Sequence, residues 1–248
     1  MKITTVLTYC TVDFRFLDIN LRQLSKFSDE IIIPLCTKFW NGDPENEDLF
    51  QKSIDIIKSY PKCTAYTFEW DPSHRNNHWY YENLNRALGT SRASNEWILF
   101  VDSDEIVEDG FGEWFETIKY SDNSYWFTCY WYFRSPCNQA KQTESAGLLI
   151  KKKYCNWDLN GNARQQLFDS KLINGDNTHI LSKDGTPFVH HMSWVRTKKE
   201  MLQKVKSWGH TNDKDWTSLI EEEFSRPFNG TDFVHGYQYN IVENKFNI

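Results

Sequence analysis

WILFVDSD, residues 97–104, is an apolar run of strand length that ends in two carboxylates one residue apart. Its five consecutive apolar side chains predict a strand buried on both faces, which is typical of parallel sheets covered by helices. In open α/β sheets, ligands bind beyond the carboxyl ends of the strands. The pattern therefore places Asp102 and Asp104 where a ligand is expected, and both can face one hard cation.

The short motif has an alternative reading, because acidic residues after a strand are also typical of helix caps and solvated turns. An EF-hand loop does not fit, since the further oxygen ligands and the required glycine are missing. The neighbouring sequence has to decide between the two.

The chain before this motif alternates strands and helices. The predicted elements are a strand over 3–8, a helix carrying Leu17, Leu21, Leu24 and Phe27, a strand over 31–33, a helix over 49–60, a strand over 64–70 and a helix over 80–92. Such alternation predicts βαβ units with right-handed crossovers. The expected fold class is α/β, with a Rossmann-like, mostly parallel central sheet flanked by helices.

The pattern changes after Asp104. Strands of a smaller mixed or antiparallel extension are predicted over 124–133 and 147–151, separated by a loop around Pro136. Residues 156–184 are rich in Asn, Asp and Gly and predict long loops with short helices. A last helix is predicted over 197–208, followed by a polar, acidic tail.

Length and composition indicate one globular domain. The 248 residues are 40% hydrophobic and 25% charged, which is ordinary for a globular protein. We expect a single domain over 1–248, with one half over 1–110, a second over 111–195, and a C-terminal helix and tail over 196–248.

The formal charge of −6 argues against a nucleic acid held by a general basic field. No apolar run is long enough for a transmembrane segment. The chain leads from Met1 directly into a strand, so we expect no signal peptide and a cytoplasmic location. Six cysteines without a C-x-x-C pair predict reduced thiols and no zinc site.

The order of these motifs resembles that of a family-2-type glycosyltransferase of the GT-A fold. The resemblance rests on residues 3–8, 28–33, 85–87 and 95–104 and covers roughly the first 110 residues. Farther on, residues 191–196, HMSWVR, followed by a helix with Lys204, resemble a C-terminal signature of small bacterial and viral relatives. The resemblance implies a nucleotide-sugar-binding half and an acceptor-side half.

The resemblance also implies a metal site. Asp102 would contact the ribose or a water on the metal, Asp104 would ligate the metal directly, and His191 would be the third protein ligand. We prefer His191 to His190 because its spacing to 194–196 matches the family pattern. Imidazole, carboxylates and diphosphate oxygens suit Mn²⁺, with Mg²⁺ as a substitute.

Other positions correspond to nucleotide-binding residues of the family. Thr8 and Tyr9 would hold the base, and Arg75 the base or a phosphate, while Arg196 and Lys204 would neutralise the leaving diphosphate. Each has a plain alternative: Tyr9 as a core residue, Arg75 as a solvated loop charge, and the basic residues after 195 as a solvated helix face. The segment 34–40 departs from the acidic, glycine-containing loop that reads the base in many relatives. The sequence therefore does not distinguish a UDP-sugar from a GDP-sugar.

An inverting transferase also needs a carboxylate that takes the proton of the acceptor hydroxyl. The candidates are Glu144 and Asp158. We favour Asp158, because the neighbouring Trp157 could stack on a sugar ring. The alternative is that Asp158 only forms the turn before Asn160 and Gly161.

The sequence therefore predicts a metal-dependent glycosyltransferase. It would move a sugar from a nucleotide diphosphate sugar to a glycan, a glycoconjugate or another hydroxyl acceptor. A phosphatase or a nucleotidyltransferase could use the same carboxylates, although a dehalogenase-type phosphatase would carry them near the N-terminus. A non-catalytic carbohydrate-binding module built from the aromatic strand over 125–133 is the third alternative.

Overall fold

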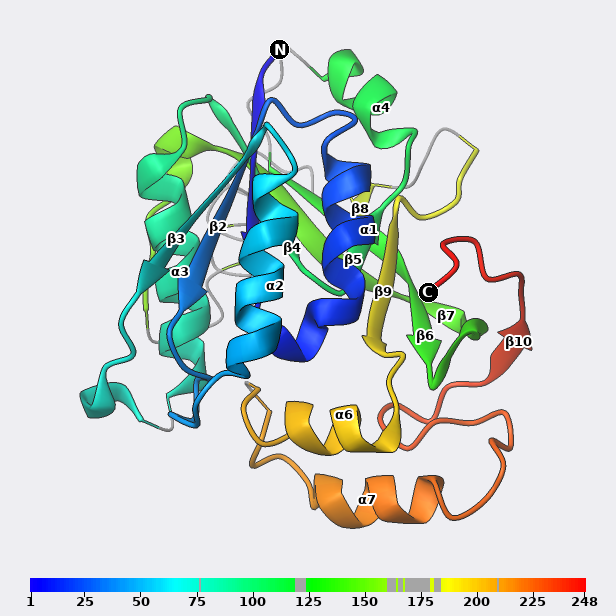
Figure 1. The fold of residues 1–248 in the computed structure, drawn as a ribbon. Coiled ribbons are helices and arrows are strands. Elements are labelled where there is room, and N and C mark those ends of the chain that lie inside the picture. The colour runs from blue at the N-terminus through cyan, green and yellow to red at the C-terminus, as the bar shows by residue number, and fades with distance from the viewer. Residues whose placement is uncertain are drawn as a thin grey trace.

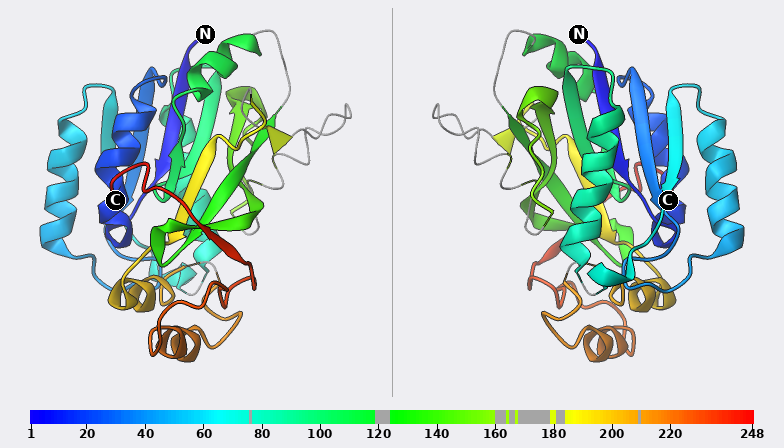
Figure 2. Two further views of the ribbon diagram at one scale, coloured as in Figure 1. Left: turned by 90° about the vertical axis from the view of Figure 1, so that its right-hand side faces the viewer. Right: turned by 90° about the vertical axis from the view of Figure 1, so that its left-hand side faces the viewer.

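A computed structural model describes residues 1–75, 77–118, 124–159, 164, 167, 179–180, 184–208 and 210–248. Within these residues, one sheet runs through both halves of the chain, in the strand order β3-β2-β1-β4-β7-β6-β9-β5. Helices cover it on both faces (Figures 1 and 2).

The first half of the sheet is parallel. Its strands are β1 (Ile3–Thr8), β2 (Glu30–Cys36), β3 (Cys63–Phe68) and β4 (Trp97–Asp102). They alternate with the helices α1 (Phe14–Leu24), α2 (Glu47–Lys58) and α3 (His78–Arg92) and the short 3₁₀ helices η1 (Thr11–Asp13) and η2 (Pro72–His74). β1 lies between β2 and β4 and pairs with both in parallel. The predicted alternation of strands and helices is confirmed.

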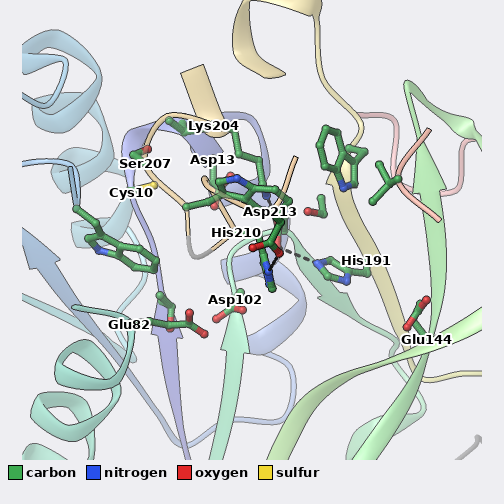
Figure 3. A pocket seen from close by; sticks show the side chains of 18 of the residues that line it. Cys10, Asp13, Glu82, Asp102, Glu144, His191, Lys204, Ser207, His210 and Asp213 are labelled. Carbon is green, nitrogen blue, oxygen red and sulfur yellow. Dashed lines mark hydrogen bonds and ion pairs between the residues drawn. The ribbon is translucent and has the colours of Figure 1, made fainter. Parts of the chain in front are cut away.

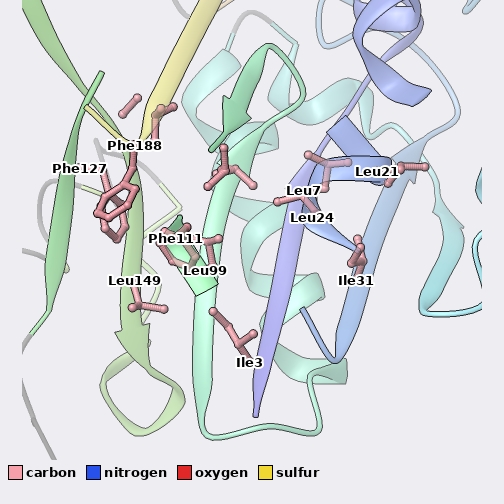
Figure 4. Packing of buried hydrophobic residues seen from close by; sticks show 14 of the residues in the cluster. Ile3, Leu7, Leu21, Leu24, Ile31, Leu99, Phe111, Phe127, Leu149 and Phe188 are labelled. Atoms are coloured by element: carbon pink, nitrogen blue, oxygen red, sulfur yellow. The ribbon is translucent and has the colours of Figure 1, made fainter. Parts of the chain in front are cut away.

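Side chains that alternate along β1 explain why helices cover both faces. Ile3 and Leu7 belong to the same buried cluster as Leu21 of α1 (Figure 4), whereas Val6 belongs to the cluster on the opposite face. On that face Gly89 of α3 packs so closely that a Cβ there would clash with the Val6 side chain. A sheet buried on both faces holds the ends of β1 and β4 rigidly.

The second half is mixed. It contains β5 (Glu105–Val107), α4 (Phe111–Thr117), β6 (Tyr125–Phe133), β7 (Ser135–Lys151), the 3₁₀ helix η3 (Lys152–Tyr154), β8 (His179–Ile180), β9 (Val189–Trp194) and β10 (Tyr239–Ile241). β7 is antiparallel to β4 and β6, β9 is parallel to β6, and β5 is antiparallel to β9.

The sheet curls so that its path nearly returns to β4. β5 lies at the far end of the strand order, yet only Ser103 and Asp104 separate it from β4 along the chain. The Asp-x-Asp motif therefore connects two strands that the sheet path separates by three others.

The predicted loop around Pro136 is wrong. β7 begins at Ser135, directly after a turn at Arg134 with φ of 59°, and is one long strand up to Lys151. Its first part is polar because one of its faces is open, and β10 pairs with it at residues 138–140. A search for apolar runs does not detect a strand that carries polar side chains on its open face.

The C-terminal region also differs from the prediction. The helix expected over 197–208 is α6 (Lys198–Lys204), which begins at a capping box of Thr197 and Glu200. The expected polar tail contains α7 (Trp216–Glu223) and β10, and its Trp216 and Phe233 pack against Trp194 of β9. The loops predicted over 156–184 lie mostly outside the described residues.

Two further findings concern the whole described chain. All six cysteines are free: Cys10, Cys36, Cys63, Cys129, Cys137 and Cys155. Among the helices that the structure describes, none has the length and the apolar character needed to cross a bilayer.

Candidate functional site

A cavity of about 640 Å³ opens at the carboxyl ends of β1 and β4. Residues of β6, β7, β9 and the segment around α6 and α7 form its other walls. In Figure 3, Glu82 and Asp102 lie on one side, and His191 and Glu144 lie on the other. Seven of the predicted site residues line the cavity: Thr8, Tyr9, Asp102, Asp104, Glu144, His191 and Lys204.

The backbone of the Asp-x-Asp turn is held by buried polar contacts. The amide Nδ2 of Asn20 donates to the carbonyl oxygens of Ser103 at 2.9 Å and of Glu105 at 3.1 Å. The Ser103 hydroxyl donates to Asp13 Oδ2 at 2.7 Å. The amide of Met192 donates to the Asp104 carbonyl at 2.7 Å. The turn is therefore fixed by α1, η1 and β9 before any ligand binds.

Asp102 is paired with two arginines. Its Oδ1 lies 3.0 Å from the NH2 nitrogen of Arg86, and its Oδ2 lies 3.0 Å from that of Arg164. Burial alone would raise the pKa of Asp102, but Arg164 and Arg86 outweigh it and lower that pKa. Asp102 is therefore ionised at neutral pH.

Asp104 is the most densely paired group of the site. It is only 3% exposed, and its Oδ2 lies 2.8 Å from Lys204 Nζ and 3.2 Å from the NH2 nitrogen of Arg196. Its Oδ1 lies 3.5 Å from His191 Nε2. Burial would raise the pKa of Asp104, but Lys204, His191 and Arg196 together hold it well below its ordinary value.

The strand register explains why His191 reaches Asp104. His191 pairs with Glu105 across β9 and β5, so it lies beside the residue that follows the motif. His190 points to the other face, where its Nδ1 lies 2.7 Å from the Tyr132 hydroxyl. Burial lowers the pKa of His191, but its contacts with Asp104 and Cys129 raise that pKa to about 10.

Two of the three predicted metal ligands fit a divalent cation. Donors on one such ion lie about 3 Å apart, because each is about 2.1 Å from the metal, and Asp104 and His191 approach this separation. The oxygens of Asp102 face arginines, and the described residues contain no group of three His, Cys, Asp or Glu side chains that could hold a metal. A cation held by Asp104 and His191 would need oxygens from a bound molecule as well, and it would have to replace the proton on His191.

The predicted nucleotide-binding residues have different surroundings. Thr8 is buried at the end of β1, and no described group lies within hydrogen-bond distance of its Oγ1. The Tyr9 ring belongs to the hydrophobic core, and its hydroxyl lies 2.5 Å from Ser53 Oγ. Arg196 is fully buried behind the cavity, where it contacts Asp13 and donates to the Val12 carbonyl. Arg75 is exposed and does not line the cavity.

The two candidate bases are separated by the structure. Glu144 on β7 lines the cavity, and its side chain is 30% exposed. Asp158 is exposed and lies outside the cavity lining. Trp157 does not line the cavity either, because it packs edge-on against Phe100 and its Nε1 donates to the Thr90 hydroxyl.

Sequence reasoning missed several residues of the site. Arg86 lies in the segment 85–87 on which the family resemblance rests, but the resemblance assigned it no role. A buried arginine on the sheet-facing side of a helix indicates an acidic partner. Arg164, 15% exposed, lies where the sequence offered no periodicity. Trp131 and His235 line the cavity too, but nothing in their local sequence distinguishes them from core and surface residues.

Comparison with known proteins bears on the fold. No protein-family model and no curated protein sequence matches this chain. The structure is similar to a crystal structure of residues 1–349 of S. aureus TarS, with a TM-score of 0.51 and 12% identity over 91% of this chain and 73% of that chain. The same protein in complex with UDP gives a TM-score of 0.50 and 11% identity over 91% and 72%. The chain has the fold of the GT-A glycosyltransferases, as the sequence predicted.

Proposed function

We propose that this chain is a glycosyltransferase that moves a sugar from a nucleotide diphosphate sugar to a hydroxyl acceptor. The observation that carries the proposal is the pair Asp102 and Asp104, fixed at the end of β4 in a GT-A fold and opening into one cavity with Lys204 and Arg164. TarS has been crystallised with UDP, so UDP is the first nucleotide to test, and GDP is the second. The finer assignment to family 2 stays a prediction.

The leaving diphosphate would lie against the cations of the cavity. Lys204 and Arg164 line it, and Arg196 stands directly behind Asp104. Positive side chains held in place by buried carboxylates do not have to reorganise when negative charge develops on the departing phosphate. The buried Thr8 hydroxyl is a further group that a bound ligand could satisfy.

We propose Mn²⁺, or Mg²⁺ in its place, as the cofactor, held by Asp104 and His191, with Asp102 close to the ribose. The ion would supply positive charge for the diphosphate oxygens. Arg75 keeps its predicted role only if a ligand extends beyond the cavity, and Tyr9 would offer the base its backbone and ring edge.

We propose inversion at the anomeric carbon, with Glu144 as the catalytic base in place of the favoured Asp158. Glu144 is the predicted candidate that lines the cavity, and Trp126 and Trp131 of the neighbouring strand β6 line the cavity as well. Aromatic rings pack on the apolar faces of sugars. A glycan or glycoconjugate acceptor therefore suits this side.

Thermal-shift measurements with UDP and GDP, each with and without Mn²⁺, test the proposal. A ligand that binds only the folded chain should raise the melting midpoint by about 5–10 °C at a hundredfold excess over its Kd. Lys204→Met should remove most of this shift. The matched control, Lys198→Met, changes a half-exposed lysine of the same helix that pairs with Glu221 and should retain the shift.

Each outcome separates one alternative. Stabilisation by free sugars but by no nucleotide would favour a carbohydrate-binding module. Stabilisation by UDP that is unaffected by Mn²⁺ would refute the metal site but not the transferase. Release of UMP in place of UDP from a UDP-sugar would indicate attack on phosphorus, as in a nucleotidyltransferase.

A further inference from the structure

The loop of residues 232–238, which leads into β10, is built on one buried carboxylate. Asp232 is 4% exposed. Its Oδ1 accepts hydrogen bonds from the backbone amides of Val234, His235 and Gly236 at 2.7, 2.6 and 3.2 Å. Its Oδ2 accepts from the amide of Tyr237 at 3.1 Å and from the Tyr239 hydroxyl at 2.8 Å. Five donors on one side chain fix the path of the loop.

This loop presents two rings to the cavity wall. The rings of His235 and Tyr237 stack at 5.0 Å with an interplanar angle of 15°, and both approach Glu144 of β7. The Tyr237 hydroxyl donates to Glu144 Oε1, and His235 Nδ1 lies 3.8 Å from the same oxygen. The other oxygen, Oε2, takes part in neither contact.

Trp131 connects this pair of rings to the donor side. Its indole packs edge-on against His235 at 4.9 Å and edge-on against His191 at 4.8 Å. His191 in turn contacts Asp104. A continuous series of packed rings therefore sets the spacing between Glu144 on β7 and Asp104 in the turn after β4.

We propose that Tyr237 and His235 are positioning residues, which aim Oε2 of Glu144 at the acceptor hydroxyl, and that Asp232 holds the loop that carries them. The inference rests on the proposed function, in which Glu144 is the base. In that reaction the acceptor oxygen bonds to the anomeric carbon, while the bond from that carbon to the phosphate oxygen breaks. Its electron pair leaves with the diphosphate, and the acceptor proton passes to Oε2.

The need for such residues follows from the freedom of a glutamate side chain. A partly exposed carboxylate samples several rotamers, and a base misplaced by about 1 Å can lose about a hundredfold in rate. Anchoring one oxygen with a hydroxyl donor leaves the second in a fixed direction. A tyrosine suits this task, because its hydroxyl donates without adding a charge that would compete for the proton.

A double-mutant cycle tests the proposal. The variants are Glu144→Gln, Tyr237→Phe and the double variant, with release of UDP or GDP measured across a panel of UDP-sugars and GDP-sugars in the presence of free sugars as acceptors. Tyr237→Phe should lower kcat at least about tenfold, with the KM for the acceptor and the UDP-induced thermal shift unchanged. The double variant should be no slower than Glu144→Gln, because Tyr237 acts only through Glu144.

Two further variants separate positioning from folding. Tyr60→Phe removes a hydroxyl that donates to Asp18 outside the cavity and should leave kcat unchanged. His235→Gln should lower kcat less than Tyr237→Phe, because its contact is longer. Full kcat in Tyr237→Phe, or losses that multiply in the double variant, would overturn the inference. Absence of any nucleotide-induced shift in the wild-type chain would instead refute the proposed function.

Discussion

The two carboxylate sites of the cavity are built in opposite ways. On the proposed donor side, Asp104 is almost fully buried among Lys204, Arg196 and His191. On the proposed acceptor side, Glu144 is more exposed and contacts a tyrosine hydroxyl and an imidazole. A site for a diphosphate needs fixed positive charge, whereas a site for a neutral hydroxyl needs one oriented oxygen.

In the proposed transferase, the two halves of the fold divide the work. The donor-side residues are held by the ends of parallel strands that are buried on both faces, where geometry is least variable. The acceptor-side residues are held by a one-sided strand and a loop that is built on Asp232. In our proposal, the first arrangement fixes the positions of charged groups, and the second fixes the direction of one carboxylate oxygen of Glu144.

The largest effect is expected for Asp104→Ala. The substitution leaves three cationic groups without their shared partner, so the free energy of unfolding should fall by about 3–5 kcal/mol and UDP-sugar turnover should disappear. Denaturant titration and UDP release measure the two effects. The control, Asp109→Ala, breaks an exposed pair with Lys26 and should change stability by less than about 0.5 kcal/mol. An unchanged unfolding midpoint in Asp104→Ala would show that the cluster is not needed for the fold.

The next largest effect is expected for a variant of Glu144, the proposed base. Glu144→Gln should lower kcat by about 10²–10⁴-fold without reducing the UDP-induced thermal shift, since the amide keeps the shape but cannot take the proton. Asp158→Asn is the matched change at the exposed candidate and should behave like the wild-type chain. If Asp158→Asn is the slow variant, the assignment of the base is reversed.

A smaller effect concerns Glu45, a half-buried carboxylate outside the cavity lining, whose described contact is with Thr11 rather than with a cation. Burial raises its pKa to about 7. The folded chain then keeps a proton that the unfolded chain releases from about pH 4.3 upward. Stability should therefore fall as the pH rises from about 4.3 through 7, by about 1–3 kcal/mol in all.

Glu45→Gln keeps the side-chain shape and removes the titration, so the unfolding free energy should lose this pH dependence. Denaturant titrations between pH 4 and pH 8 measure it. Glu47→Gln, at an exposed position two residues away, is the control and should follow the wild-type curve. A Glu45→Gln curve that also follows the wild type would contradict the assignment.

The fold could be predicted from sequence as far as β4, because β-branched or apolar strands alternate there with helices whose apolar residues recur at helical spacing. The prediction failed at β7, whose polar face resembles a loop, and after residue 209, where the buried Trp216 and the partly buried Phe233 are isolated aromatic residues in a polar segment. Asp102 and Asp104 follow directly from the end of a buried strand. Arg164, Trp131 and His235 could not be found, because long-range packing alone brings them to the cavity.

The choice between Glu144 and Asp158 shows the same limit. The sequence favoured Asp158 for its neighbouring tryptophan, but Trp157 is needed in the core against Phe100. Aromatic residues near a carboxylate do not indicate a sugar site until their packing is known. Our proposal favours Glu144 because its position on β7 places it at the cavity.

A crystal structure of the chain with UDP and Mn²⁺ would show where the donor binds. We expect the diphosphate between Lys204 and Arg164, with the ion on Asp104 and His191 and the ribose beside Asp102. UDP bound away from this cavity, or bound in it with its phosphates far from Lys204 and Arg164, would contradict the claim that this end of β4 is the donor site.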